Sequence, residues 1–202
     1  MCIAKRRLAR GVTLVELIVF IVIVATSVVG ILTALDLSNR SGTDPMVQKQ
    51  ALAIAEALLE EVQLQPFTYC DPDDPQAATA DSTGCSATPP GIEGVGPETA
   101  APYGPELRAS GTNPFDNVND YHGFCMGPAC ATPTVITDLS GTAIDGLAAY
   151  TASVTVTGQA LGGVPVVPDT DSLLITVTVN GPANTTVVLH GYRVRYAPNA
   201  LP

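Results

Sequence analysis

A long apolar run near the amino terminus constrains this chain more than any other feature. Leu17 to Leu35 contains no charged residue, and Asp36 ends the run. As an α-helix rising 1.5 Å per residue, such a segment reaches roughly the 30 Å thickness of the hydrocarbon core of a bilayer. The sequence therefore predicts one membrane-embedded helix over residues 12–37.

Basic residues precede this run and are absent directly after it. Lys5, Arg6, Arg7 and Arg10 stand before it, and the next basic residue is Arg40. Positive charge beside a membrane helix favours the cytoplasmic side, so we expect the amino terminus in the cytoplasm and the rest of the chain across the membrane. A removable secretory signal would have a shorter apolar region followed by a cleavage site of small residues.

One acid, Glu16, lies inside the start of the apolar segment. An ionisable side chain at mid-bilayer costs about 3 kcal/mol on insertion scales and by default indicates a function. The plainer alternative is a carboxylate that reaches the membrane interface, where the cost is small. The residues around Glu16 favour the functional interpretation.

The segment from Arg10 to Leu17, RGVTLVEL, resembles the class III signal of type IV pilins and of the pseudopilins of type II secretion. The resemblance implies that residues 1–11 are a leader, which prepilin peptidase removes between Gly11 and Val12. It also implies N-methylation of Val12, and pairing of Glu16 with the amino terminus of a neighbouring subunit during assembly. Val12 departs from the family, whose first mature residue is usually Phe or Met.

This resemblance implies a structural subunit and not an enzyme. It places the protein in the inner membrane as a single-pass protein with a periplasmic headgroup, and then in a pilus or pseudopilus. The implied partners are prepilin peptidase, other pilin subunits through the N-terminal helix, and the inner-membrane assembly platform. The long loop region and Val12 favour a minor pilin, and residues 113–124 more loosely resemble minor pilins of the mannose-sensitive haemagglutinin type. The alternatives are a minor pseudopilin of a type II secretion system and a membrane-tethered binding domain that does not assemble.

The charge balance is strongly acidic. The chain has 19 acidic and 9 basic residues, and four of the basic ones lie in residues 1–11, which leaves five against nineteen and a formal charge of −14. Such a balance argues against a nucleic-acid-binding surface. It suits a soluble headgroup outside the membrane.

Four of the five cysteines lie beyond the apolar run. An even number in an oxidising compartment indicates two disulfides, with three possible connectivities. We favour the two that close short loops, because each then lies within one irregular region. A zinc site is the weaker alternative, since no C-x-x-C is present. The favoured pairs are Cys70–Cys85 and Cys125–Cys130.

Residues 38–65 are expected to contain a break followed by an amphipathic helix. Ser, Asn and Gly are frequent over Ser38 to Pro45 and favour turns, and the residue before a proline avoids the α region. From Met46 to Gln65 apolar residues recur at spacings of three and four until Pro66. The predicted apolar face consists of Val47, Ala51, Ile54, Ala55, Leu58, Leu59 and Val62.

Residues 66–147 are rich in Pro, Gly, Asp and Thr and are predicted to be irregular. Asp116, Asn117, Asn119 and Asp120 offer oxygen ligands for calcium, but their spacing does not match an EF-hand loop. We favour Asx turns there and at the aspartates of residues 71–74. The sequence therefore assigns no metal ligand and no cofactor.

Residues 148–202 are predicted to form an antiparallel sheet. Residues 150–157 and 173–179 alternate apolar and polar side chains, and residues 185–196 continue the pattern. Together with the helices these strands indicate an α+β fold. Packing of the amphipathic helix on one face of the sheet, as in pilin headgroups, is what the resemblance implies.

No catalytic residue is predicted. The spacing around the two histidines, His122 and His190, indicates neither an acid and a serine nor a cysteine as a catalytic partner. The sequence also contains no G-x-S-x-G, H-E-x-x-H or phosphate-loop motif.

Overall fold

The computed structural model describes residues 13–86 and 91–201, with the side chains of residues 36–44 left out of the description. The chain divides into two compact units, and the boundary lies between Pro45 and Met46. Gly11 and Val12, the predicted cleavage and methylation site, lie outside the described residues. The predicted α+β class is confirmed by one long helix and a four-stranded antiparallel sheet.

Helix α1 runs from Leu14 to Leu64 with Pro45 inside it. The predicted interruption over residues 38–45 is therefore wrong at the level of secondary structure, although the boundary between the two units falls at Pro45. Gly costs about 1 kcal/mol and Pro about 3 kcal/mol in a helix interior, and tertiary context commonly overrides such propensities. The strongly helical segments on both sides outweigh the weak preferences of the Ser, Asn and Gly between them.

The sheet is a meander in the order β1-β2-β3-β4. Its strands are β1 (Cys125–Met126), β2 (Thr151–Gly158), β3 (Ser172–Asn180) and β4 (Thr186–Val194). The last three confirm the predicted strands. Strand β1 was not predicted, since two residues are too few to show an alternating pattern; it pairs antiparallel with β2.

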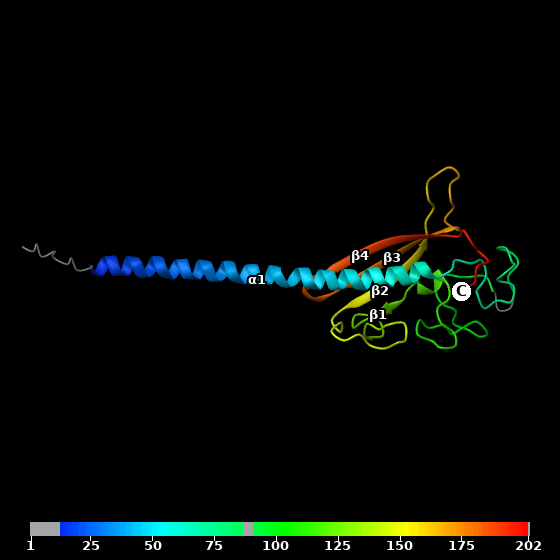
Figure 1. Ribbon diagram of the computed structural model, residues 1–202, viewed down its shortest axis with the longest axis horizontal. Helices are drawn as coiled ribbons and strands as arrows, with labels where there is room; N and C mark the ends of the chain where they lie inside the picture. The colour runs from blue at the N-terminus through cyan, green and yellow to red at the C-terminus, as the bar shows by residue number, and fades with distance from the viewer. Residues whose placement is uncertain (1–12, 87–90, 202) are drawn as a thin grey trace, which may run out of the picture. The chain divides into compact units, whose positions relative to one another are not determined.

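One face of the sheet and the second half of α1 form the core. Val154, Val177 and Leu189 make one cross-strand row on the inner face. The helix part that begins at Met46 lies along the strands in Figure 1. The predicted apolar face is confirmed: its residues Ala51, Ile54, Ala55, Leu58 and Val62 are buried, while Val47 and Leu59 pack partly buried against the core.

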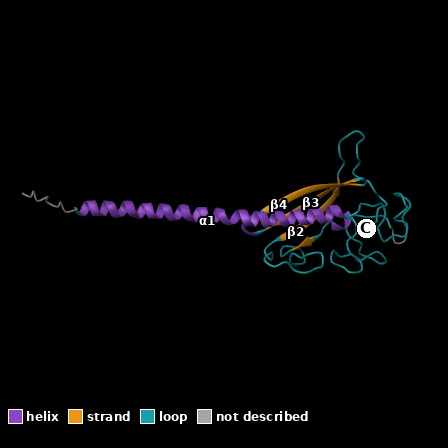
Figure 2. Cartoon of the chain, viewed as in Figure 1, coloured by secondary structure: helices purple, strands orange, loops and turns teal. Residues whose placement is uncertain are grey.

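The predicted irregular region is confirmed over most of its length, as the loops between α1 and β2 in Figure 2 show. Its described part contains the short 3-10 helix η1 (Val118–Tyr121) and strand β1. Arg108 fastens this region to α1: its Nε and Nη2 atoms donate to Glu61 at 2.6 and 2.7 Å, and Nη1 donates to the carbonyls of Thr137 and Asp138. Tyr121 Oη also donates to Glu61, at 2.8 Å.

Candidate functional site

The first half of α1 carries the segment that the sequence singled out for assembly. Thr13 caps the helix, because its Oγ1 accepts the backbone N–H of Glu16 at 3.3 Å and its carbonyl accepts that of Leu17. Glu16 is exposed in the first turn, where a negative charge suits the helix dipole.

Residues Leu14–Leu35 are long and apolar enough to cross a membrane, with a mean hydropathy of 2.8. Their large hydrophobic side chains are 42–76% exposed. A helix that exposes apolar side chains on all sides needs an apolar environment, which is either lipid or other helices.

Both favoured disulfides are present. Cys70–Cys85 closes a loop with a sequence separation of 15, and Cys125–Cys130 one with a separation of 5. The first follows α1, and the second begins at strand β1. Such bonds persist in an oxidising compartment.

The loops after α1 bring seven carboxylates together, which we call the acidic cluster. They form three groups of three, and within each group the candidate ligand oxygens lie within 4.8 Å of one another. Asp71 and Glu98 each belong to two groups and so link them. The members of the acidic cluster are Asp71, Asp73, Glu93, Glu98, Glu106, Asp116 and Asp120.

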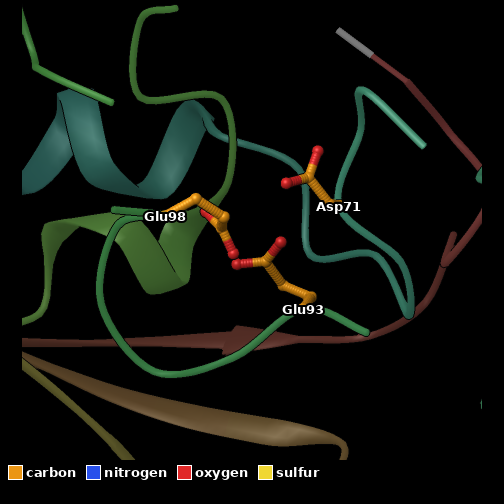
Figure 3. A group of neighbouring side chains, drawn as sticks. All are labelled: Asp71, Glu93 and Glu98. Carbon is orange, nitrogen blue, oxygen red and sulfur yellow. The ribbon is translucent and has the colours of Figure 1, made fainter. Parts of the chain in front are cut away.

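Backbone contacts bring these separate segments together. Cys70 and Ile92 form an antiparallel bridge, in which Asp71 N donates to the Gly91 carbonyl at 2.8 Å and Glu93 N to the Tyr69 carbonyl at 3.0 Å. This bridge brings the two segments together, and one carboxylate oxygen of Asp71 lies within 4.8 Å of one of Glu93. Figure 3 shows the carboxylates of Glu93 and Glu98 pointing toward one another, with that of Asp71 nearby.

The remaining members are held in a similar way. Glu106 N donates to the Glu98 carbonyl at 2.9 Å, so these two glutamates also lie side by side. Asp120 Oδ2 accepts the backbone N–H groups of Asp116 and Asn117 at 2.9 and 2.7 Å, which orients it at the start of η1. Hydrogen bonds within the chain thus position these members of the cluster.

Several oxygens of the acidic cluster are buried without a hydrogen-bond donor among the described residues. Asp71 is 1% exposed; its Oδ1 accepts the N–H of Asp73 at 2.7 Å, whereas its Oδ2 has no donor. Asp120, also 1% exposed, has no donor at Oδ1. The same holds for both oxygens of Glu93 and for Oε2 of Glu98.

Two amides beside Asp120 add further oxygens of this kind. Asn117 is fully buried; its Nδ2 donates to Thr68 Oγ1 at 2.7 Å, and its Oδ1 finds no donor in the described structure. Asn119 is 5% exposed and likewise has an unpartnered buried Oδ1. Buried polar groups are normally paired, so a concentration of unpaired acceptors calls for an explanation.

Burial dominates the electrostatics of the cluster. It raises the pKa of Asp71 to about 6, against the lowering effect of a backbone hydrogen bond. It raises the pKa of Asp116 to about 8, helped by the charge of Asp120. The pKa of Asp120 itself rises to about 7 through burial, although two backbone N–H groups lower it.

The two glutamates Glu93 and Glu106 show the same effect more strongly. Burial, reinforced by the nearby charge of Asp120, raises the pKa of both. Two ionised carboxylates 4.8 Å apart repel by roughly 3–4 kcal/mol at an effective dielectric constant of 20. Within residues 13–86 and 91–201 the ion pairs are Arg108–Glu61 and Arg195–Asp171, and neither neutralises a member of the cluster.

Asx turns were predicted for both acidic stretches and are confirmed at two aspartates of residues 71–74. Asp71 accepts the N–H of Asp73, and Asp74 accepts that of Gln76 at 2.7 Å. The described structure shows none at residues 116–120, where Asp120 instead accepts the N–H groups of the preceding residues Asp116 and Asn117. The convergence of the seven carboxylates was not predicted from the sequence. No motif could have indicated it, because the residues are spread over fifty positions of irregular chain.

A groove of about 690 Å³ lies between the second half of α1 and residues 136–147. Ile54 and Leu58 line it from the helix, and Ile136, Ile144 and Leu147 from the loop. It is largely apolar and is separate from the acidic cluster, with which it shares no lining residue.

The chain thus has an exposed apolar helix with Glu16 in its first turn, an α+β unit, and an acidic cluster in the loops between α1 and the sheet. Searches of protein-family models, curated proteins and solved structures returned no match for this chain.

Proposed function

We propose that this protein is a minor type IV pilin-like structural subunit. It is inserted in the inner membrane, processed by prepilin peptidase, and assembled into a fibre or used to prime one. The observation that carries the proposal is the position of Glu16, five residues after Gly11 and at the start of an apolar helix that continues into a folded unit.

Two opposite charges near the start of the apolar helix would stabilise one another in an assembled fibre. When apolar helices bundle, an unpaired carboxylate among them is expensive to bury. A free amino terminus at Val12 carries the complementary charge. Pairing of Glu16 of one subunit with Val12 of a neighbour would satisfy both groups. We infer that it would also set the register between subunits, a role that a single buried polar residue has in coiled coils.

The first test is processing at Gly11. In cells that contain prepilin peptidase, we expect the mature chain to begin at Val12 and to carry one added methyl group, as measured by intact mass and N-terminal sequencing. Gly11→Leu should leave the chain uncleaved, because the class III signal that the segment resembles is cut after a glycine. Gly30→Ala is a matched control, since a Cβ there meets nothing within 4 Å.

An uncleaved wild-type chain would contradict the proposal and favour the membrane-tethered binding domain. If the chain is cleaved, its partners separate a pilus from the alternative, a minor pseudopilin of type II secretion. Cross-linking through the apolar helix, followed by mass spectrometry of the captured subunits, gives that distinction.

A further inference from the structure

We propose that the acidic cluster binds calcium, with Asp71, Glu93 and Glu98 as its central ligands. This inference goes beyond the structural role proposed above and does not depend on it. It also departs from the sequence analysis, which assigned no metal ligand. The reason is that the fold collects carboxylates that are far apart in the sequence.

The spacing of the oxygens suits one ion shared by several side chains. Calcium is held by oxygen ligands at about 2.3–2.6 Å, so two ligands on opposite sides of the ion are about 4.6–5.2 Å apart. The oxygens in each group of the cluster lie within 4.8 Å of one another. Carboxylates at this separation lie close enough for one ion to be coordinated by all three.

The unpartnered oxygens are the second and independent observation. Asp71 and Asp120 are each almost fully buried, and each uses one oxygen to accept backbone N–H groups. The other oxygen has no donor among the described residues. An Asx turn explains only the bonded oxygen, so turn formation alone does not account for these side chains.

A neighbouring aspartate shows what a purely structural carboxylate looks like in the same loop. Asp74 is 3% exposed and accepts hydrogen bonds from Gln76 N, from Ser86 N and Oγ, and from Tyr103 Oη, at 2.7–3.5 Å. It does not belong to the acidic cluster. The same fold thus satisfies Asp74 with protein donors, whereas Asp71 Oδ2 and both carboxylate oxygens of Glu93 have none among the described residues.

The ligand type selects calcium among the common metal ions. All candidate ligand atoms of the three groups are carboxylate oxygens. Zinc prefers sulfur and imidazole ligands, and Cys70, the nearest cysteine in sequence to Asp71, is in a disulfide. Magnesium requires near-ideal octahedral geometry and usually keeps several waters, whereas calcium accepts six to eight oxygens in flexible geometry.

Calcium bound by Asp71, Glu93 and Glu98 would fasten two stretches of loop to one another. The central ligands come from residue 71 and residues 93–98, and the two other groups, which share Asp71 or Glu98 with the central one, add residues 73, 106, 116 and 120. These stretches otherwise meet through a small number of backbone hydrogen bonds. The ion would replace mutual repulsion of carboxylates by attraction to a common centre. The loop region would then be most stable in a compartment rich in calcium.

The test uses the full chain in detergent, stripped of metal with EDTA and then dialysed. Calcium chloride is titrated by calorimetry, and thermal unfolding is followed by circular dichroism with and without calcium. We expect saturable binding with Kd below about 1 mM, the range of extracellular calcium modules, and a rise in Tm of several degrees. Magnesium should bind at least tenfold more weakly.

Variants separate the site from general charge effects. Glu98→Gln should weaken calcium binding at least tenfold, because Glu98 belongs to two of the three groups. Its Tm in EDTA should stay equal to the wild type or rise, since a repelling charge is removed, and this measurement verifies folding. Asp138→Asn is the matched control. Asp138 is an exposed loop aspartate that accepts hydrogen bonds from Ser140 and Thr142, and its substitution should leave the calcium affinity unchanged.

Absence of binding heat and of a Tm rise in the wild type, up to about 10 mM calcium, would overturn the inference. So would equal affinities of Glu98→Gln and the wild type. Neither result bears on processing at Gly11, so failure of this inference and failure of the proposed function are distinguishable.

Discussion

Asp71 and Asp74 stand three positions apart in one loop and are both buried, yet their surroundings have opposite effects. Burial raises the pKa of Asp71 to about 6. Burial acts in the same direction on Asp74, but hydrogen bonds from Gln76, Ser86 and Tyr103 outweigh it, and its pKa falls below the ordinary value. The number of donors around a carboxylate, more than its burial, decides whether the charged form is favoured.

The raised pKa values in the acidic cluster predict how the stability of the metal-free protein depends on pH. The folded-state pKa values of Asp71, Asp116 and Asp120, about 6, 8 and 7, lie above the unfolded value of 3.8. The folded state therefore holds more protons, and stability falls as pH rises from about 4 to about 8. We expect the Tm of the full chain in EDTA to fall over this interval, as measured by circular dichroism.

Calcium should remove most of that fall, because the ion binds the ionised carboxylates. The matched measurement is the same pH series with saturating calcium. A Tm in EDTA that rises steadily between pH 4 and pH 8 would contradict the assignment of raised pKa values to the cluster.

At the scale of elements, the helix–sheet contact depends on one face of α1. Leu58 is 2% exposed and packs in the core, whereas Leu64, six residues further along the same helix, is 76% exposed. Deleting a buried leucine side chain removes its transfer free energy and leaves a cavity.

We predict that Leu58→Ala lowers the free energy of unfolding by about 2–5 kcal/mol. Leu64→Ala, the control, should change it by less than about 0.5 kcal/mol. Urea unfolding of the full chain in detergent, followed by circular dichroism, measures both. Equal effects of the two substitutions would show that the helix does not pack on the sheet through this face.

Also at this scale, local signals predicted some elements and missed others. The apolar face of residues 46–64 and the alternation in β2, β3 and β4 are repeated several times within each element, so the sequence sufficed. Strand β1 has two residues and owes its existence to pairing of Cys125 with Ser153 and of Met126 with Ala152. The continuation of α1 through Pro45 was also missed, because it depends on the helical segments on either side of Pro45.

For the whole molecule, the proposed function predicts that Glu16 matters for assembly and not for folding. Glu16→Gln should reduce the amount of protein in sheared fibres at least tenfold, because a neutral amide cannot neutralise a neighbour's amino terminus. Cleavage at Gly11 and the Tm of the exported unit should not change. Immunoblots of the sheared and membrane fractions measure incorporation.

The control for this prediction is Glu56→Gln, which alters an exposed acid in the second half of the same helix. Normal incorporation of Glu16→Gln would remove the support for assembly and would favour the tethered domain.

The sequence by itself determined those features that residues close together in the chain specify. These are the apolar helix with Glu16 at its start, the amphipathic face that packs on the sheet, the three long strands, and the two short-loop disulfides. Each follows from periodicity, hydropathy or loop length, and each of these is a local property.

Only the tertiary structure decided the acidic cluster. Its members stand at positions 71 to 120 without a repeated spacing, in a region with almost no regular secondary structure. Their meeting depends on the bridge between Cys70 and Ile92 and on the hydrogen bonds that orient Asp120. Which loop carboxylates converge, and which oxygens are left without donors, is set by long-range backbone contacts that no local pattern in the sequence encodes.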